Sequence, residues 1–231
     1  NTWTKGSELG MSRAQVLAQV NQRSGLPLSW RATYESPRMT PDGTTANRII
    51  QLMAQNRDRP FFIAAGFHKP HQPWVGPEKF FIKHDSDAVS LPNSRLEDIL
   101  DIPPPAAEIR SDDEALNQRQ HKQAIASYHA MVSMTDEYVG QLMQALDDLG
   151  LAQSTIVVFT SDHGFHLGEH GGMWRKRSQF DESIRVPLIV RLPDGSNAGD
   201  SAAGIVELVD LYPTLLDISG LPNPSHQLEG T

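Results

Sequence analysis

An aspartate and a histidine stand side by side in Ser161-Asp162-His163-Gly164, directly after an apolar run. A carboxylate oxygen suits Ca²⁺ or Mg²⁺, and an imidazole can offer a nitrogen to a metal or a hydrogen bond to a substrate. Gly164 would let the backbone turn sharply or approach a ligand closely. Asp162 and His163 are therefore a candidate metal site. The competing interpretation is a capping aspartate beside a histidine that bonds to loop carbonyls, and these four residues alone favour it.

The segment that follows, residues 165–177, is rich in histidine and glycine and ends in three consecutive cations. His166 and His170 are candidate substrate-binding residues. Lys176 lies in the middle of the basic run 175–177, which could bind an anion. The alternative for this basic run is a solvated loop face.

A second polar cluster, residues 66–74 with the sequence GFHKPHQPW, also follows an apolar run. Two prolines should hold His68, Lys69 and His71 in a rigid loop, and preorganised groups stabilise developing charge best. A histidine can also protonate a leaving group near neutral pH. The alternative is a surface loop anchored by a buried Trp74. The residues alone favour neither interpretation.

Helices and strands alternate in the predicted elements that must position these clusters. Short apolar runs between breakers predict buried strands at 61–65, 155–160 and 186–190. Apolar spacings of three and four predict helices at 12–20, 45–54, 117–149 and 205–218.

Gly150 should end the longest helix, and residues 66–117 otherwise look loop-like. The fold class predicted by this alternation is an α/β sandwich with a mostly parallel central sheet covered by helices. Both polar clusters follow strands, so they should meet at the carboxyl edge of that sheet.

The composition excludes several classes of protein. The chain has 231 residues, and 39% of them are hydrophobic, so it can bury a core. Its net charge of -8 argues against nucleic acid binding, which requires clustered Lys and Arg. It has no cysteine, which excludes a disulfide framework and a thiolate metal site within this chain. No apolar run approaches the ~20 residues of a membrane span, and the first residues do not form a signal peptide.

Several motifs, in a consistent order, resemble the sulfatase family, and in particular its iduronate-2-sulfatase-like branch. The segment 61–71, FFIAAGFHKPH, is similar to one family motif, and TSDHG at 160–164 with LGEHG at 167–171 is similar to another. The resemblance continues through Trp174-Arg175-Lys176, through residues 180–189 and through residues 206–215. It covers most of residues 41–220.

The resemblance implies an alkaline-phosphatase-like fold and hydrolysis of a sulfate ester on a small molecule or glycan. It places Asp162 and His163 at a divalent cation, usually Ca²⁺ with Mg²⁺ as the alternative. Lys176 matches the lysine that contacts sulfate, and His68 matches the histidine near the ester oxygen. These two are the expected catalytic residues, and Lys69, His166 and His170 are expected to bind substrate.

The family's nucleophile has no counterpart in this chain. In the family, a Cys or Ser in a C/S-x-P-x-R motif matures to formylglycine, and this chain contains neither form of the motif. The formylglycine and further metal-binding aspartates are therefore expected upstream. Residues 1–231 are expected to form a partial catalytic domain, incomplete at both ends, whose N-terminal remainder could be a separate partner chain.

Two other functions are compatible with these motifs. A phosphate or phosphonate ester hydrolase of the same superfamily would use a similar oxyanion site, and a degenerate relative could bind sulfated glycans without cleaving them. The family resemblance also implies a secreted, periplasmic or lysosomal location.

Overall fold

The computed structural model describes residues 28–93, 96–106 and 116–231. The helix expected at 12–20 lies outside these residues. The chain divides into two compact units. The first combines Asn1–Thr155 with His163–Arg185, and the second combines Ile156–Asp162 with Val186–Thr231.

The first unit contains a parallel strand pair. Strand β1 (Trp30–Thr33) pairs with β2 (Trp74–Pro77), and Trp30 lies opposite Trp74. The short helix α4 (Glu78–Phe81) follows β2, and the 3₁₀ turns η2 (Ser86–Ala88) and η3 (Leu96–Ile99) come next. The stretch expected to be loop-like thus contains a strand and several single turns, which are too short to show a hydrophobic period.

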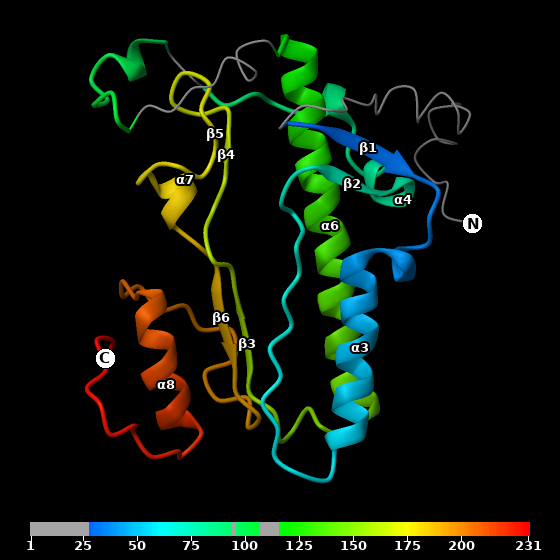
Figure 1. Cartoon of the computed structure of the whole chain (residues 1–231), viewed down its shortest axis with the longest axis vertical. Coiled ribbons are helices and arrows are strands. Elements are labelled where there is room, and N and C mark those ends of the chain that lie inside the picture. Colours follow the sequence, from blue (N-terminus) through cyan, green and yellow to red (C-terminus); the bar gives the residue numbers. More distant parts are fainter. Residues whose placement is uncertain (1–27, 94–95, 107–115) are drawn as a thin grey trace. The chain divides into compact units, whose positions relative to one another are not determined.

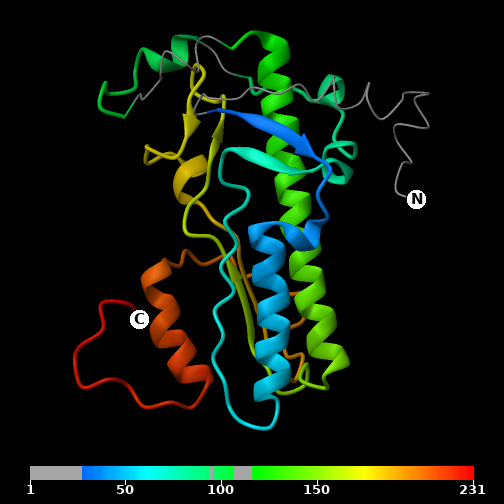
Figure 2. The ribbon, with the colours of Figure 1, turned by 45° about the vertical axis from the view of Figure 1, so that its right-hand side comes forward.

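Two long helices of the first unit lie side by side, α3 (Pro41–Asn56) and α6 (Gln118–Asp148), as Figures 1 and 2 both show. Each begins at a capping side chain: Thr40 accepts the N–H of Gly43, and Asn117 forms a capping box with Gln120. Gly150 follows α6 with φ of 69°, a conformation that favours glycine. Both predicted helices and the predicted stop are confirmed.

Residues 163–185 of the first unit form a small hairpin and a helical turn. Strands β4 (His166–Leu167) and β5 (Trp174–Arg175) are antiparallel, and α7 (Asp181–Ile184) follows. Before β4, the N–H of Gly164 donates to the carbonyl of Ser183 at 2.7 Å. A Cβ at position 164 would lie 2.1 Å from the carbonyl oxygen of Glu182, so only glycine fits there.

Aromatic and sulfur-containing side chains fill the core of the first unit. Trp74 is fully buried and lies 6.2 Å from Trp174, measured between ring centroids. Burial of each such side chain stabilises the fold by about 1.5–3 kcal/mol. Other members of the same buried cluster are Leu28, Trp30, Phe80, Met131, Met134 and Tyr138. The loop before β2 and the hairpin β4–β5 therefore share one core.

The second unit contains one strand pair and one C-terminal helix. Strand β3 (Val157–Thr160) pairs antiparallel with β6 (Leu188–Arg191), and Phe159 lies opposite Ile189. The turn η4 (Leu208–Asp210) leads directly into α8 (Leu211–Ile218). This helix confirms the C-terminal part of the helix predicted at 205–218.

Two strand predictions were wrong in detail. Residues 61–65 form no strand, and Phe62 in this run is 83% exposed. The run at 155–160 does form a strand, but β3 pairs antiparallel with β6, and Phe159 is 38% exposed instead of buried. An apolar run reports hydrophobicity and does not report the direction or number of its neighbours, so the sequence could not distinguish these arrangements.

Among the described residues, no helix combines the length and the apolar character needed to cross a bilayer.

Candidate anion and metal site

The loop that carries His68 is held by a buried carboxylate. Asp42, in the first turn of α3, is 4% exposed. Its two carboxylate oxygens accept the backbone N–H groups of His68 and Lys69, each at 2.9 Å. Hydrogen bonds to a charged acceptor are stronger than neutral ones, so Asp42 fixes the backbone from which the His68 side chain projects.

Four further hydrogen bonds hold the same loop. The indole N–H of Trp74 donates to the Pro70 carbonyl at 2.9 Å, and the Thr135 hydroxyl of α6 donates to the Lys69 carbonyl at 3.1 Å. The Lys69 ammonium donates to the carbonyls of His71 and Pro73. The loop is therefore anchored by Trp74 and also presents an exposed His68. A surface loop anchored by a buried Trp74 is thus compatible with a rigid loop that presents a histidine for chemistry.

Lys69 and His68 have different surroundings although they are neighbours. The Lys69 ammonium binds carbonyls of its own loop, and burial lowers its pKa, although Asp42 opposes that shift. Its contacts give it a part in shaping the loop. The His68 ring lies 4.8 Å from the His71 ring, measured between centroids, and is exposed.

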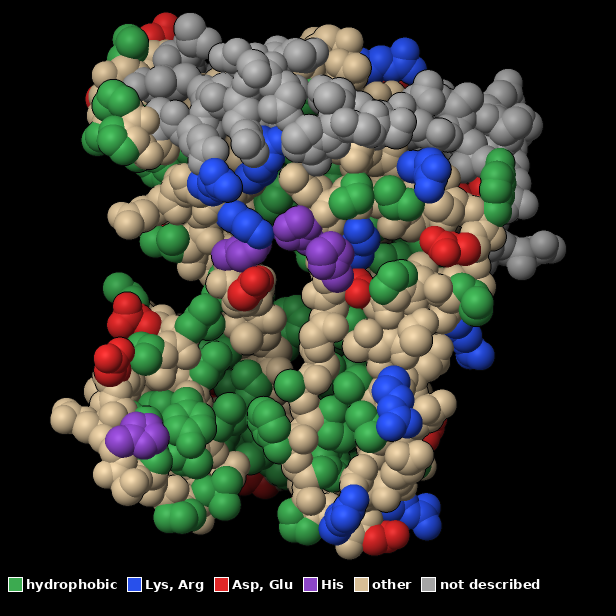
Figure 3. Space-filling model, viewed as in Figure 1, with side chains coloured by type: hydrophobic (Ala, Val, Ile, Leu, Met, Phe, Trp, Pro, Cys, Tyr) green, Lys and Arg blue, Asp and Glu red, His purple; other side chains and the backbone are tan. Residues whose placement is uncertain are grey.

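Lys176 is one of the charged groups that lower the pKa of His68. Burial lowers the pKa of His68, Lys69 and His71 lower it further, and Lys176 adds to the same effect against an opposing contribution from Asp42. Cations that lower the pKa of a histidine also create a positive potential, which favours a bound anion. Figure 3 shows histidine side chains beside lysine and arginine side chains on the viewed face.

Between Asp162 and His163 the chain passes from the second unit to the first. Asp162 is exposed and ends the first segment of the second unit, whereas His163 begins the second segment of the first unit. The Nδ1 of His163 lies 2.7 Å from the Gly164 carbonyl. A carbonyl only accepts, so Nδ1 carries the proton and the lone pair of the neutral ring is on Nε2.

His166 is buried, in contrast to His68. It is 1% exposed, and its Nε2 lies 2.7 Å from the Ser178 hydroxyl. Its Nδ1 lies 3.7 Å from the Glu169 carboxylate. Its ring centroid is 5.7 Å from that of His170. The structure thus brings the two histidines expected to bind substrate together, and this burial leaves His166 little surface for a substrate.

His170 lies between two carboxylates. Its Nδ1 is 2.9 Å from Asp98 and its Nε2 is 3.2 Å from Glu182, and its ring stacks on Phe180 at 4.2 Å between centroids. Burial lowers the pKa of His170, but the hydrogen bonds and charges of Asp98 and Glu182 outweigh burial and raise the pKa above 6.5. Protonated His170 therefore links η3 to α7.

This raised pKa predicts a pH-dependent contribution to stability. The contribution is fully present below the unfolded pKa of about 6.5 and is lost as the pH rises through the higher folded pKa. We expect His170→Asn to lower the free energy of unfolding by about 0.5–1 kcal/mol at pH 6, a modest value because the groups are partly exposed. At pH 9 the loss should be smaller, because His170 has then lost its positive charge. Urea denaturation with a chelator present measures this difference.

Asparagine is the chosen replacement because His170 has φ of 49°, which asparagine tolerates. The matched control is His226→Asn, at an exposed histidine of the second unit. A His170→Asn effect that is the same at both pH values would contradict the role of the two carboxylates.

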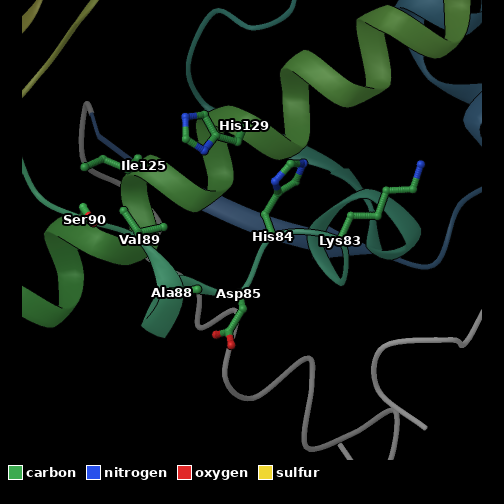
Figure 4. A pocket seen from close by; sticks show the side chains of 8 residues that line it. All are labelled: Lys83, His84, Asp85, Ala88, Val89, Ser90, Ile125 and His129. Carbon is green, nitrogen blue, oxygen red and sulfur yellow. The ribbon is translucent and has the colours of Figure 1, made fainter. Parts of the chain in front are cut away.

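A hollow beside α6 holds another pair of histidines. It has a volume of about 320 Å³. His84 lies 2.8 Å from the Ser133 hydroxyl and 5.8 Å from His129 between ring centroids, and burial lowers the pKa of His129. Figure 4 shows Lys83 and Asp85 pointing away from these rings, so the charged groups do not converge on one point.

Two features of the loop support were not predicted from the sequence. Asp42 was not predicted as a supporting residue, because nothing near it in the sequence shows that its carboxylate reaches residues 68 and 69. Thr40 and Tyr138 form a buried hydrogen bond of 2.7 Å beside it, and Tyr138 also donates to the Pro37 carbonyl at 2.8 Å. Their large separation in sequence gives no signal.

Solved structures define the class of the fold. The phosphonate monoester hydrolase of Agrobacterium radiobacter has a TM-score of 0.75 and 24% identity, over 98% of this chain and 47% of that chain. A protein in complex with its substrate D-glucosamine-2-N,6-O-disulfate has a TM-score of 0.60 and 22% identity, over 86% of this chain and 51% of that chain. The predicted α/β, alkaline-phosphatase-like fold class is confirmed.

The Sulfatase family model matches residues 7–221, and the chain belongs to the sulfatase family. It is 38% identical to human iduronate 2-sulfatase over an aligned length of 231, and the alignment covers 80% of this chain and 40% of that protein. It is 34% identical to a sulfatase of Formosa agariphila over 198 residues, which cover 83% of this chain and 39% of that protein. The chain thus spans about two fifths of the length of these curated relatives.

Proposed function

We propose that the full-length protein is a sulfuric ester hydrolase, and that residues 1–231 are a partial catalytic domain that supplies part of its metal and sulfate site. The observation that carries this proposal is that the charge of Lys176 contributes to lowering the pKa of His68. The two residues come from segments far apart in the sequence, and both match positions that the family resemblance assigns to the sulfate ester.

Each residue has a chemical role in this proposal. The Lys176 ammonium neutralises charge on the sulfate oxygens. His68 is exposed, and the positive charges of Lys69 and Lys176 act on it, so it can bind an anion, and its pKa rises when that anion arrives. In the protonated form it can give its proton to the departing alcohol oxygen. Asp42 and Lys69 hold the loop that places His68.

Asp162 and His163 would hold the divalent cation, which when bound supplies positive charge to the sulfate and to the nucleophile. The His163 contact fits this role, because donation from Nδ1 to Gly164 puts the lone pair on Nε2, the atom that would face a metal. Ca²⁺ takes six to eight ligands, mostly oxygens. These two residues therefore fit part of a shell that upstream aspartates would complete.

A sulfated carbohydrate is the substrate class that we propose. Human iduronate 2-sulfatase and an N-acetylglucosamine-6-O-sulfatase of Bacteroides thetaiotaomicron, 41% identical over 122 residues (52% of this chain and 22% of that protein), both have names that specify sulfated sugars. We also propose that the nucleophile comes from an N-terminal portion, in the same chain or in a partner, and that the enzyme acts outside the cytoplasm or in a lysosome.

The test compares esters that differ in the transferred group. The full-length protein, loaded with Ca²⁺, should hydrolyse an aryl sulfate with a kcat/KM at least ~100-fold above that for the matched aryl phosphate or phosphonate monoester, a difference of ~2.7 kcal/mol. A reversed order would support a phosphonate or phosphate hydrolase. Binding of a sulfated oligosaccharide without turnover of any ester would support a non-catalytic binder.

A further inference from the structure

Two histidines and a glutamate of the first unit lie close together in a way that no part of the proposed sulfate site uses. His166 in β4, His170 in the turn after β4, and Glu182 in α7 each offer a ligand atom, and these atoms all lie within 4.8 Å of one another. They converge although they come from a strand, the turn that follows it, and a separate helix. The ring stacking of His170 on Phe180 holds one of the three in place.

The donor types in this cluster select the kind of metal. Two imidazole nitrogens and one carboxylate oxygen suit Zn²⁺ and similar first-row metals, whereas Ca²⁺ prefers an oxygen shell. Bonds of about 2.0–2.1 Å in a tetrahedral site place ligand atoms roughly 3.4 Å apart. The Nε2 of His170 and Oε2 of Glu182 are already 3.2 Å apart, so only His166 must approach.

The surroundings of both histidines resemble those of metal ligands. A ligating histidine usually offers its second ring nitrogen to a carboxylate, which fixes its tautomer and orientation. Asp98 lies 2.9 Å from Nδ1 of His170, and Glu169 lies 3.7 Å from Nδ1 of His166. Each ring thus has a carboxylate near Nδ1, and Nε2 of His170 already faces Glu182.

The buried histidine supplies an independent argument. His166 is 1% exposed, and its Nδ1 is a buried atom without a hydrogen-bond partner among the described residues. Such an atom is costly. If Nε2 bound a metal, a proton on Nδ1 would be drawn towards Glu169, whose carboxylate is already fixed by the N–H of Leu167 at 2.6 Å. The metal would replace the Ser178 hydroxyl that now contacts Nε2.

We propose that His166, His170 and Glu182 form a binding site for Zn²⁺ or a similar transition-metal ion, with Asp98 and Glu169 as the carboxylates that orient the two histidines. The fourth ligand would be water. This inference does not depend on the proposed hydrolase activity, because it concerns a different set of side chains and a different class of metal.

The test measures zinc binding to the Ca²⁺-loaded full-length protein in competition with a chromophoric chelator. We expect one Zn²⁺ per chain, with at least ~10-fold weaker binding in His170→Asn and in Glu182→Gln. The matched control is His129→Asn, which removes a histidine from the hollow beside α6 and should leave zinc binding unchanged. Circular dichroism establishes that each variant is folded.

A second readout identifies the geometry. Co²⁺ in place of Zn²⁺ should give the intense visible absorption of a tetrahedral site, and Glu182→Gln, which keeps the side-chain shape, should reduce it. The absence of stoichiometric zinc binding, or zinc binding that is equally strong in His170→Asn and Glu182→Gln, would overturn the proposal.

Discussion

In the full-length protein, Lys176→Met should lower kcat/KM for an aryl sulfate by about 10²–10³-fold, which corresponds to roughly 2.7–4 kcal/mol of lost transition-state stabilisation. Methionine keeps most of the side-chain length and removes the charge that we propose faces the sulfate. The pKa of His68 provides a second readout, because Lys176 contributes to its lowering. That pKa should rise in Lys176→Met.

Sulfate binding gives the same prediction a test without turnover. Inorganic sulfate should raise the pKa of His68 in the unmodified protein, as measured by NMR titration of the imidazole, because an anion offsets the neighbouring cations. In Lys176→Met a higher sulfate concentration should be needed for the same shift. The control is Arg48→Met, which removes one exposed cation from α3. Equal effects of the two substitutions would show that only net charge matters.

The second large effect is expected at Asp42. Asp42→Ala leaves the backbone N–H groups of His68 and Lys69 without their carboxylate acceptor, and loss of a buried charged acceptor costs about 2–4 kcal/mol in free energy of unfolding. Urea denaturation measures this loss. Turnover should fall as well, because the His68 side chain is no longer placed by a fixed backbone.

Two variants separate this role from a general loss of charge. Asp42→Asn keeps the shape and one acceptor oxygen, so it should be less damaging than Asp42→Ala. Asp58→Ala removes a carboxylate whose side chain is 90% exposed and should change stability by less than about 0.5 kcal/mol. The role of Asp42 in the loop is wrong if Asp42→Ala and Asp58→Ala are equally stable.

The sequence predicted the parts of the fold that depend on local pattern. The helices α3 and α6 carry long apolar periods with capping residues, and Gly150 marks a real stop. Strand pairing was less accessible, because β3 has an apolar run that fits either strand direction. The short strand β2 was missed because four residues, WVGP, carry no measurable period.

The candidate site was predictable where residue type and order were distinctive. The sequence identified His68 and Lys176, and the charge of Lys176 contributes to lowering the pKa of His68. The catalytic roles of His68 and Lys176 at the sulfate ester remain predictions, as do the metal-binding roles of Asp162 and His163. The sequence could not show that Asp42 supports the loop or that His166 is buried, since both depend on contacts between distant segments.

Helix α6 supports three separate segments through side chains that lie within two turns of the helix. Ser133 contacts His84, Thr135 donates to the Lys69 carbonyl, and Tyr138 donates to the Pro37 carbonyl. An α-helix rotates by about 100° per residue. Inserting or deleting one residue before Ser133 would therefore turn all three side chains away from their partners together. The helix should accept many exchanges on its solvent side across evolution, but its length up to this point should be invariant.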